Sequence, residues 1–350
     1  MIAQPLGLVA GEAVEVRSEA EILCTLDAAG KLEGLPFMPE MLQFCGTRTQ
    51  VYRRANKTCD TVNKNMARRM ENTVHLESLR CDGSGHGQCE AGCLLYWKEA
   101  WLKRPAASPR AGTTPHTSAP LVQLTRAGLT ALCSNIEADG ETRYRCQATE
   151  LPGAGARLEW WEPGQYFREL TTRNIGLGTF LKAMAISWFN AIQRWRGGLP
   201  YPYVEGFIEG KTPDVRLDLE PGEFVRVRSI DEIRSTLSVH QRNRGLWFDV
   251  EMVPYCGGEY RVQRRVNRII DERTGRIMTW PGDCIVLDGV VCNGCLSRNR
   301  LFCTRAITPY WREIWLERVV SAGASTYLGA HTKAKVLPNA KPSAGPDDRT

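Results

Sequence analysis

The sequence lacks any apolar run of about 18 residues, the length that a membrane-spanning helix requires. Its most apolar stretch, residues 176–195, is interrupted by Lys182, Asn190, Gln193 and Arg194. The first residues contain neither the basic segment nor the apolar core of a secretory signal. We therefore expect a soluble, cytoplasmic protein with no membrane partner.

The common short motifs of catalysis are also missing. We find no glycine-rich phosphate loop, no nucleophile elbow, no H-E-x-x-H zinc motif and no dinucleotide-binding fingerprint. The sequence therefore predicts no catalytic residue, and a non-enzymatic role is favoured. The net charge of +6 is only mildly basic, which permits a nucleic-acid partner but does not argue for one.

What the chain does contain is an internal repeat. The segment from Gly11 to Asp60 aligns without a gap with residues 222–271, and 22 of the 50 positions are identical. After three extra residues in the second copy, "YWKEAWLKR" from Tyr96 aligns with "YWREIWLER" from Tyr310. This similarity indicates a tandem duplication of one domain of about a hundred residues.

The repeat sets the predicted domain boundaries. The first copy spans residues 8–104, and the second spans 216–320. Residues 105–120 are rich in Pro, Ser, Thr and Ala, which is typical of a flexible linker. Residues 121–215 form a connecting region with a helical segment, and residues 321–350 are predicted to be a disordered tail.

Each copy is predicted to be a small α+β module built around an antiparallel sheet. Alternating segments at "AVEVR" and "FVRVR" predict a strand, and Ser18 with Glu21, like Ser229 with Glu232, predicts a capped helix directly after it. A closing C-terminal helix is predicted in each copy, and Thr308 and Pro309 would begin it in the second. Trp97 and Trp101, like Trp311 and Trp315, lie four residues apart and are expected to pack in the core from one face of that helix. The strand count resembles that of an SH3-like barrel.

Eight of the thirteen cysteines follow the repeat. Three positions are shared, and each copy has a fourth cysteine at a place of its own: Cys93 in the first and Cys295 in the second. The candidate ligand sets are Cys45, Cys81, Cys89 and Cys93, and then Cys256, Cys292, Cys295 and Cys303. A metal site with four thiolate ligands explains why each copy keeps a set of four cysteines although the position of the fourth differs. A cysteine that served only as a buried apolar side chain would not need to be replaced by another cysteine elsewhere in the copy.

The spacing leaves the metal open. Two structural zinc ions are favoured, and an iron–sulfur cluster is the alternative, because both take four thiolates and only one C-x2-C pair is present. Thiols without metal are a third interpretation. His86, between Cys81 and Cys89, is a minor candidate for a ligand, and a solvated loop histidine is the simpler interpretation.

Three other groups of residues attract attention. The glutamates Glu99 and Glu313, at equivalent positions of the two copies, predict buried or bridging ion pairs. Trp160 and Trp161, with Tyr166 and Phe167, could line an aromatic recognition groove, but packing of the two tryptophans between the copies is favoured. Basic side chains along the second copy could contact nucleic acid, although a solvated strand face is the simpler interpretation; they are Arg261, Arg264, Arg265, Arg268, Arg273 and Arg276.

These features together predict an intracellular, zinc-stabilised binding or assembly protein with an unknown protein partner. An iron–sulfur redox protein and a nucleic-acid-binding protein are the alternatives.

Overall fold

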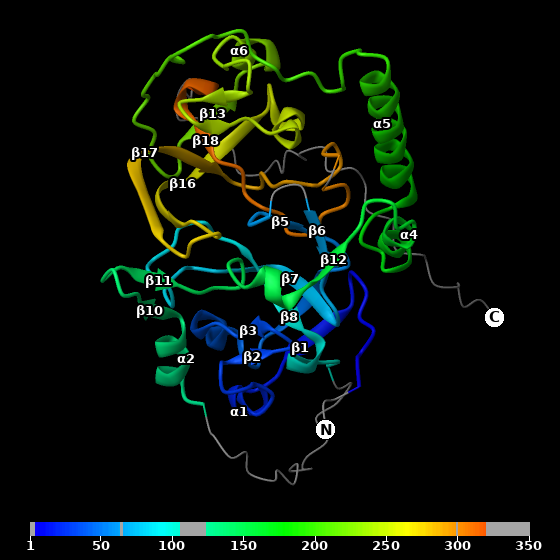
Figure 1. Cartoon of the computed structure of the whole chain (residues 1–350), viewed down its shortest axis with the longest axis vertical. Helices are drawn as coiled ribbons and strands as arrows, with labels where there is room; N and C mark the ends of the chain where they lie inside the picture. The colour runs from blue at the N-terminus through cyan, green and yellow to red at the C-terminus, as the bar shows by residue number, and fades with distance from the viewer. Residues whose placement is uncertain (1–3, 64–65, 106–123, 299, 320–350) are drawn as a thin grey trace, which may run out of the picture.

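The computed structural model describes residues 4–63, 66–105, 124–298 and 300–319. The chain is a mixed α+β structure whose main sheets are antiparallel, as expected, with one sheet in each half of the molecule (Figure 1). Apart from residue 105, the predicted linker 105–120 lies outside the described residues, as does the predicted tail 321–350.

The first half is built on a five-stranded sheet. Its order is β8 (Leu94–Lys98), β7 (Thr73–Arg80), β4 (Arg48–Arg54), β1 (Ala13–Val16) and β9 (Leu102–Lys103). The hairpin β2 (Lys31–Leu32) to β3 (Leu35–Pro36) and the 3-10 helix η1 (Pro39–Phe44) lie between β1 and β4 in the chain.

The second half has a sheet of the same order. It runs β18 (Trp311–Arg312), β17 (Ile277–Leu287), β16 (Glu259–Ile270), β13 (Phe224–Val227) and β19 (Leu316–Arg318). The hairpin β14 (Arg242–Asn243) to β15 (Leu246–Trp247) and the 3-10 helix η3 (Val250–Tyr255) take the places of β2, β3 and η1. Both halves therefore follow one sequence of elements.

Each first strand leads into a short capped helix, α1 (Glu19–Leu23) or α6 (Ile230–Arg234). The Ser18 hydroxyl accepts the Glu21 amide N–H, and the Glu21 carboxylate accepts the Ser18 N–H at 2.9 Å. Ser229 and Glu232 make the same pair of contacts. The two predicted capping boxes are confirmed, and each satisfies amides that a helix start leaves free.

The predicted closing helix is wrong in both halves. Residues 94–103 form β8, the 3-10 turn η2 (Glu99–Trp101) and β9, and residues 311–318 form β18, the 3-10 turn η4 (Glu313–Trp315) and β19. Their backbone groups pair with the sheet, as Trp97 does opposite Val74. A strand followed by one tight turn directs two aromatic rings four residues apart into the same core, so the spacing alone does not require a helix.

The tryptophans nevertheless pack in the core, as predicted. Trp97 and Trp101 are fully buried and meet Phe37 edge-to-face, with ring centroids 6.2 and 5.1 Å apart. In the second half Trp311 and Trp315 surround Phe248 in the same way. Edge-to-face rings add to the energy of burial, so these clusters are main contributors to the stability of each half.

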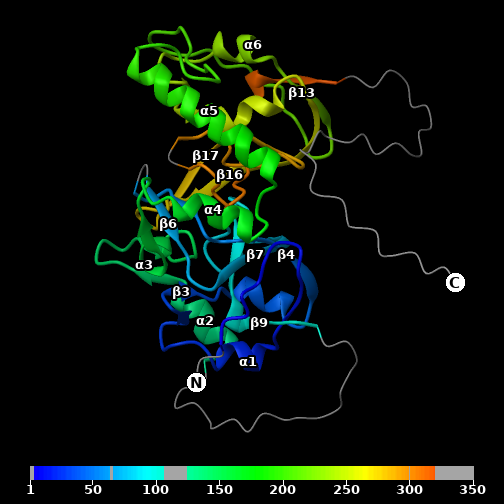
Figure 2. The ribbon, with the colours of Figure 1, turned by 90° about the vertical axis from the view of Figure 1, so that its right-hand side faces the viewer.

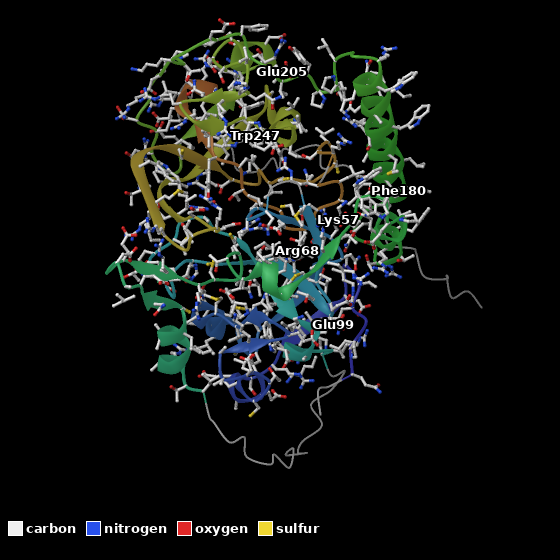
Figure 3. All side chains as sticks on the ribbon, viewed as in Figure 1. Lys57, Arg68, Glu99, Phe180, Glu205 and Trp247 are labelled. Atoms are coloured by element: carbon white, nitrogen blue, oxygen red, sulfur yellow. The ribbon has the colours of Figure 1, made fainter. Side chains whose placement is uncertain are left out.

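Each half contains a buried glutamate that forms an ion pair with an arginine of the sheet, so the predicted ion pairs are confirmed. Glu99, labelled in Figure 3, accepts the amides of Gly7 and Leu8 and pairs with Arg54. Glu313 accepts three amides, those of residues 217–219, and pairs with Arg265 at 2.7 Å. Burial raises the pKa of Glu313, but the amides and Arg265 outweigh it and lower the pKa below its usual value. Each carboxylate thus ties the first segment of its half to the last.

The first part of the connecting region completes the first half. Strand β12 (Ala156–Leu158) pairs with β6 (Met66–Arg69), which pairs with β5 (Thr58–Asp60). Gln147 bridges to the backbone of Tyr96, and the region also contributes α2 (Arg126–Leu132), α3 (Leu151–Ala154) and the hairpin of β10 (Ser134–Ile136) and β11 (Thr142–Tyr144). These residues share the core of the first sheet.

The second part contains α4 (Gly164–Thr171) and α5 (Leu177–Trp195), which lie along one side of the molecule (Figure 2). Phe180 of α5 stacks on Phe302 at 5.5 Å. The expectation that Trp160 and Trp161 pack between the halves is wrong, because they are 68% and 61% exposed. None of the helices in the described residues is long and apolar enough to cross a membrane.

The buried glutamate gives a first prediction. Glu313→Gln keeps the size of the side chain but leaves Arg265 without its charge partner, and we expect unfolding to become easier by about 3 kcal/mol. A urea titration followed by tryptophan fluorescence measures this. Glu317→Gln is the control, because Glu317 pairs with Arg226 on an exposed surface, and its midpoint should not move. Equal shifts in the two variants would contradict the role of Glu313.

A second prediction concerns His75, which is fully buried with Nδ1 3.0 Å from the Leu95 carbonyl. Burial lowers the pKa of His75 to about 3. In the unfolded chain His75 takes up a proton near pH 6.5, whereas in the folded chain it stays neutral. The free energy of unfolding therefore falls as the pH drops below 6.5, by up to about 1.4 kcal/mol per pH unit. His75→Gln should show a shallower loss between pH 6.5 and 5.5 than the original chain; an identical slope would exclude His75 as the cause.

Candidate metal centre

The candidate site lies in the loop that joins β7 to β8, residues 81–93. This loop folds back sharply on itself, and Gly83 makes the fold possible. Gly83 has φ +73°, and a Cβ there would stand 2.1 Å from the carbonyl oxygen of Cys89. The close approach brings Cys81 and Cys89, eight residues apart, to the same side of the loop.

Three side chains converge beside this turn. The Sγ of Cys81 lies 3.5 Å from Nε2 of His86 and 3.2 Å from Oε1 of Glu40, and Nδ1 of His86 lies 3.2 Å from the same carboxylate oxygen. Glu40 comes from η1, the 3-10 helix that follows the β2–β3 hairpin. The three ligand atoms are within 4.8 Å of one another, and they form the one such group in the described part of the chain.

Cys89 and Cys93 face the same small cavity. Cys89 shares a hydrogen bond with His86, and the Cys81 amide donates to the Cys93 carbonyl at 2.8 Å. The cavity has a volume of about 30 Å³ and is also lined by Tyr96 and Cys146. A space of this size holds one ion or about two water molecules, but no organic substrate.

The spacing fits a tetrahedral zinc ion. With Zn–S near 2.3 Å and Zn–N near 2.0–2.1 Å, two ligand atoms of a tetrahedron lie about 3.6 Å apart. The observed distance from Cys81 Sγ to His86 Nε2 is 3.5 Å. Glu40 stands where it can orient the imidazole from its other nitrogen, as carboxylates do behind metal-bound histidines.

The electrostatics of the group also favour a cation. Burial and the neighbouring Glu40 raise the pKa of Cys81. Burial alone would lower the pKa of His86, but Cys89 and Glu40 raise it to about 9. Oε2 of Glu40 is buried without a hydrogen-bond partner among the described residues. Buried polar atoms without partners are costly, and a bound cation would offset the excess of negative groups.

The structure assembles a set that differs from the four cysteines suggested by the repeat. Cys81, Cys89 and Cys93 line the cavity, but Cys45 does not; the charges nearest to Cys45 are Glu19 and Arg126. His86 and Glu40 stand in its place. The sequence signal for His86 was its position inside the cysteine loop, and the signal for Glu40 was its repetition as Glu251.

The second half arranges its cysteines differently. Glu251, the counterpart of Glu40, accepts the amides of three successive residues, Cys295, Leu296 and Ser297, at 2.7–3.1 Å. Cys256 lies beside the Met252 carbonyl at 4.0 Å. No three of Cys256, Cys292, Cys295 and Cys303 come within 4.8 Å of one another in the structure as described. Glu251 therefore accepts hydrogen bonds from backbone amides, whereas its counterpart Glu40 faces the thiol of Cys81.

Cys59, which has no cysteine counterpart in the repeat, joins the second set. Its amide donates to the Sγ of Cys303 at 3.1 Å, and the two thiols share a hydrogen bond. That hydrogen bond raises the pKa of Cys59 and lowers the pKa of Cys303. Both side chains are buried. The two residues are 244 positions apart in the chain, so the spacing of cysteines in the sequence could not predict this contact.

Each cysteine loop is completed by a strand of the opposite half. In the first half, Ile270 N–H donates to Cys89 Sγ at 3.4 Å, and Glu90 N–H donates to the Arg268 carbonyl at 3.0 Å. In the second half, the Thr304 N–H donates to the Lys57 carbonyl at 3.0 Å, beside the contact of Cys59 with Cys303. Figure 1 shows the ends of β16 and β17 reaching the first half, and β5 lying beneath the loop of the second.

No protein-family model, curated protein or solved structure matches this chain.

The geometry predicts that mutations of Cys81 and of Cys45 have different effects on metal binding. Cys81→Ser should abolish zinc binding at this site, because serine is a poor ligand for zinc and the Cys81 sulfur lies at the centre of the group. Cys45→Ser is the matched control and should keep the metal. Elemental analysis of the two purified variants measures the difference. Loss of the metal from both variants alike would restore Cys45 as a ligand.

Proposed function

We propose that this protein is a zinc-stabilised binding or assembly protein made of two duplicated modules. The observation that carries the proposal is the convergence of Cys81, His86 and Glu40 at ligand distances. In this proposal Cys81, His86, Cys89 and Cys93 hold one zinc ion, and Glu40 supports the imidazole. The metal would have a structural role, because it would link side chains from both ends of the loop in addition to the hydrogen bonds that already hold the loop.

The size of the site supports zinc over an iron–sulfur cluster. In a cluster each thiolate binds its own iron, so the ligands surround a bulky inorganic core. The cavity of about 30 Å³ and the 3.5 Å approach of Cys81 to His86 suit ligands that share one ion. The same small, buried space argues against a catalytic thiol, which would need room for a substrate.

The matching order of elements supports the duplication. Ala13 and Phe224 begin equivalent strands, and the ion pair of Glu99 with Arg54 has its equivalent in Glu313 with Arg265. We keep an SH3-like barrel as the proposed fold of each module, since the two five-stranded sheets have the same strand order. We extend the zinc proposal to Cys256, Cys292, Cys295 and Cys303, and we expect that site to be the weaker one because Glu251 is already hydrogen-bonded.

An exposed apolar stripe supports a protein partner. Four large side chains on α5 remain largely in solvent, at spacings of four and seven residues along one helix face: Leu177 (62%), Leu181 (57%), Trp188 (71%) and Trp195 (89%). Exposed apolar surface of this extent is uncommon on proteins that act alone.

The arginines of the second half offer less support for nucleic acid than their number suggested. Arg265 pairs with the buried Glu313, Arg276 pairs with Asp139 and Glu141, and Arg264 donates to the Glu90 carbonyl. Guanidiniums already bound to protein groups are poorly placed to neutralise phosphates. We therefore keep the protein partner as the proposal.

Metal analysis tests this function. Purified protein should contain two zinc ions per chain and be colourless, and mild chelation should remove the zinc of the second module first. Complete removal should lower the melting temperature, and added zinc should restore it, because metal binding contributes to folding. Iron with inorganic sulfide would establish the cluster instead, and a metal-free protein with an unchanged melting temperature would refute the metal-stabilised module.

A further inference from the structure

A second, larger cavity lies apart from the metal centre, with a volume of about 530 Å³. It is bounded by the C-terminal half of α5 and residues 200–205. The second module contributes residues 241–242, Trp247, Val250, 295–298 and 300–301, and the first contributes residues 59–61 and Met66. Figure 2 shows α5 running beside the second module. Ser187, Asn190 and Arg194 of this helix line one wall of the cavity. The volume falls in the range of sites for small organic ligands.

Two guanidiniums in this cavity have no partner. Arg194 and Arg298 are both exposed, and no carboxylate, hydrogen bond or ion pair within the described residues engages either side chain. Burial and the positive charge of Arg298 lower the pKa of Arg194, so the two groups are close enough to repel. Arg194 in the last turn of α5 also suits the helix dipole, but this does not account for Arg298 beside it.

The other charges of the cavity do not offset this pair. Asp60 is bound by Arg68 and by backbone amides, and Arg300 is paired with Asp249. Arg242 donates to the Gly245 carbonyl, which leaves its charge uncompensated. The carboxylate left to face these guanidiniums is that of Glu205, which accepts the Tyr203 hydroxyl at 3.2 Å. The cavity therefore carries an excess of positive charge.

The cavity also presents aromatic surface. Trp247 is 46% exposed although its indole N–H is held by Gln241 at 3.0 Å and its ring packs against the Arg300 guanidinium at 5.5 Å. Tyr201, on the opposite segment, is 57% exposed. Figure 3 labels Trp247 and Glu205 on this part of the molecule. An aromatic ring held in place and left open is suited to stack on a planar group.

We infer that this cavity binds a nucleotide, with its phosphates between Arg194 and Arg298 and its base against Trp247. Guanidiniums bind phosphate oxygens through two parallel hydrogen bonds, and phosphate would remove the repulsion between the two arginines. The same chemistry could belong to a free nucleotide or to one residue of a nucleic-acid strand. The volume, which suits one small molecule, favours the free nucleotide.

Calorimetric titration of ADP into the full-length, metal-loaded protein tests the inference. ADP should bind at one site per chain, and Arg298→Gln should weaken the affinity about tenfold or more, because it removes a charged hydrogen-bond donor. Trp247→Leu should also weaken ADP binding but leave the affinity for inorganic pyrophosphate unchanged. Arg48→Gln is the control, since Arg48 lies on the first sheet and is 68% exposed, and it should bind ADP normally.

The possible results separate the alternatives. The inference is wrong if ADP does not bind, or if Arg298→Gln binds it as well as the original chain does. Pyrophosphate binding as tight as ADP binding would remove the role of Trp247. An oligonucleotide that binds more than tenfold tighter than ADP, with the same sensitivity to Arg298→Gln, would assign the site to a strand. Melting temperatures of the variants, expected to be unchanged because the side chains are exposed, show that folding is not the cause.

Discussion

Each module uses the backbone of the other to close its cysteine loop, and the rest of the structure depends on this exchange. Glu90 donates to the Arg268 carbonyl while Ile270 donates to Cys89, and Thr304 donates to the Lys57 carbonyl while Cys59 donates to Cys303. Amides that donate to sulfur favour the thiolate form. A change in one cysteine loop must therefore alter the packing of both modules, and separating the modules would expose unpaired backbone groups.

The same exchange explains why the two modules differ inside. Both have a glutamate on the 3-10 helix that precedes the long strand, Glu40 or Glu251. Glu40 faces Cys81 and His86, whereas Glu251 is taken up by the amides of the loop after Cys295. The carboxylate thus contacts a thiol and an imidazole in one module and supports a backbone loop in the other. Two halves with the same order of elements can therefore differ in the side-chain contacts of their cysteine loops.

The connecting region binds the two modules into one body and creates new surface between them. Its first part completes the sheet and core of the first module, and α5 packs through Phe180 on Phe302 of the second. The cavity that contains Arg194 and Arg298 exists because α5 and the loop after Cys295 meet. Cys295 belongs to the second cysteine set and also lines this cavity, whereas Cys81, Cys89 and Cys93 line only the smaller one. The cavity therefore adjoins the second cysteine loop and is separate from the first.

The sequence by itself determined the repeat, the capping boxes, the antiparallel strands, the burial of the tryptophans and the ion pairs of Glu99 and Glu313. These features depend on local spacing or on residues present in both copies. It could not determine that the closing segment is a strand and a turn, because rings four residues apart suit either geometry. Only the tertiary structure decided which groups meet at Cys81. Cys45 is a repeated cysteine and Glu40 a repeated glutamate, but the fold of the loop at Gly83 places the glutamate and His86 at the thiol, and leaves Cys45 outside. Which side chains converge is set by packing across distant segments, and that information is not present in the spacing of residues along the chain.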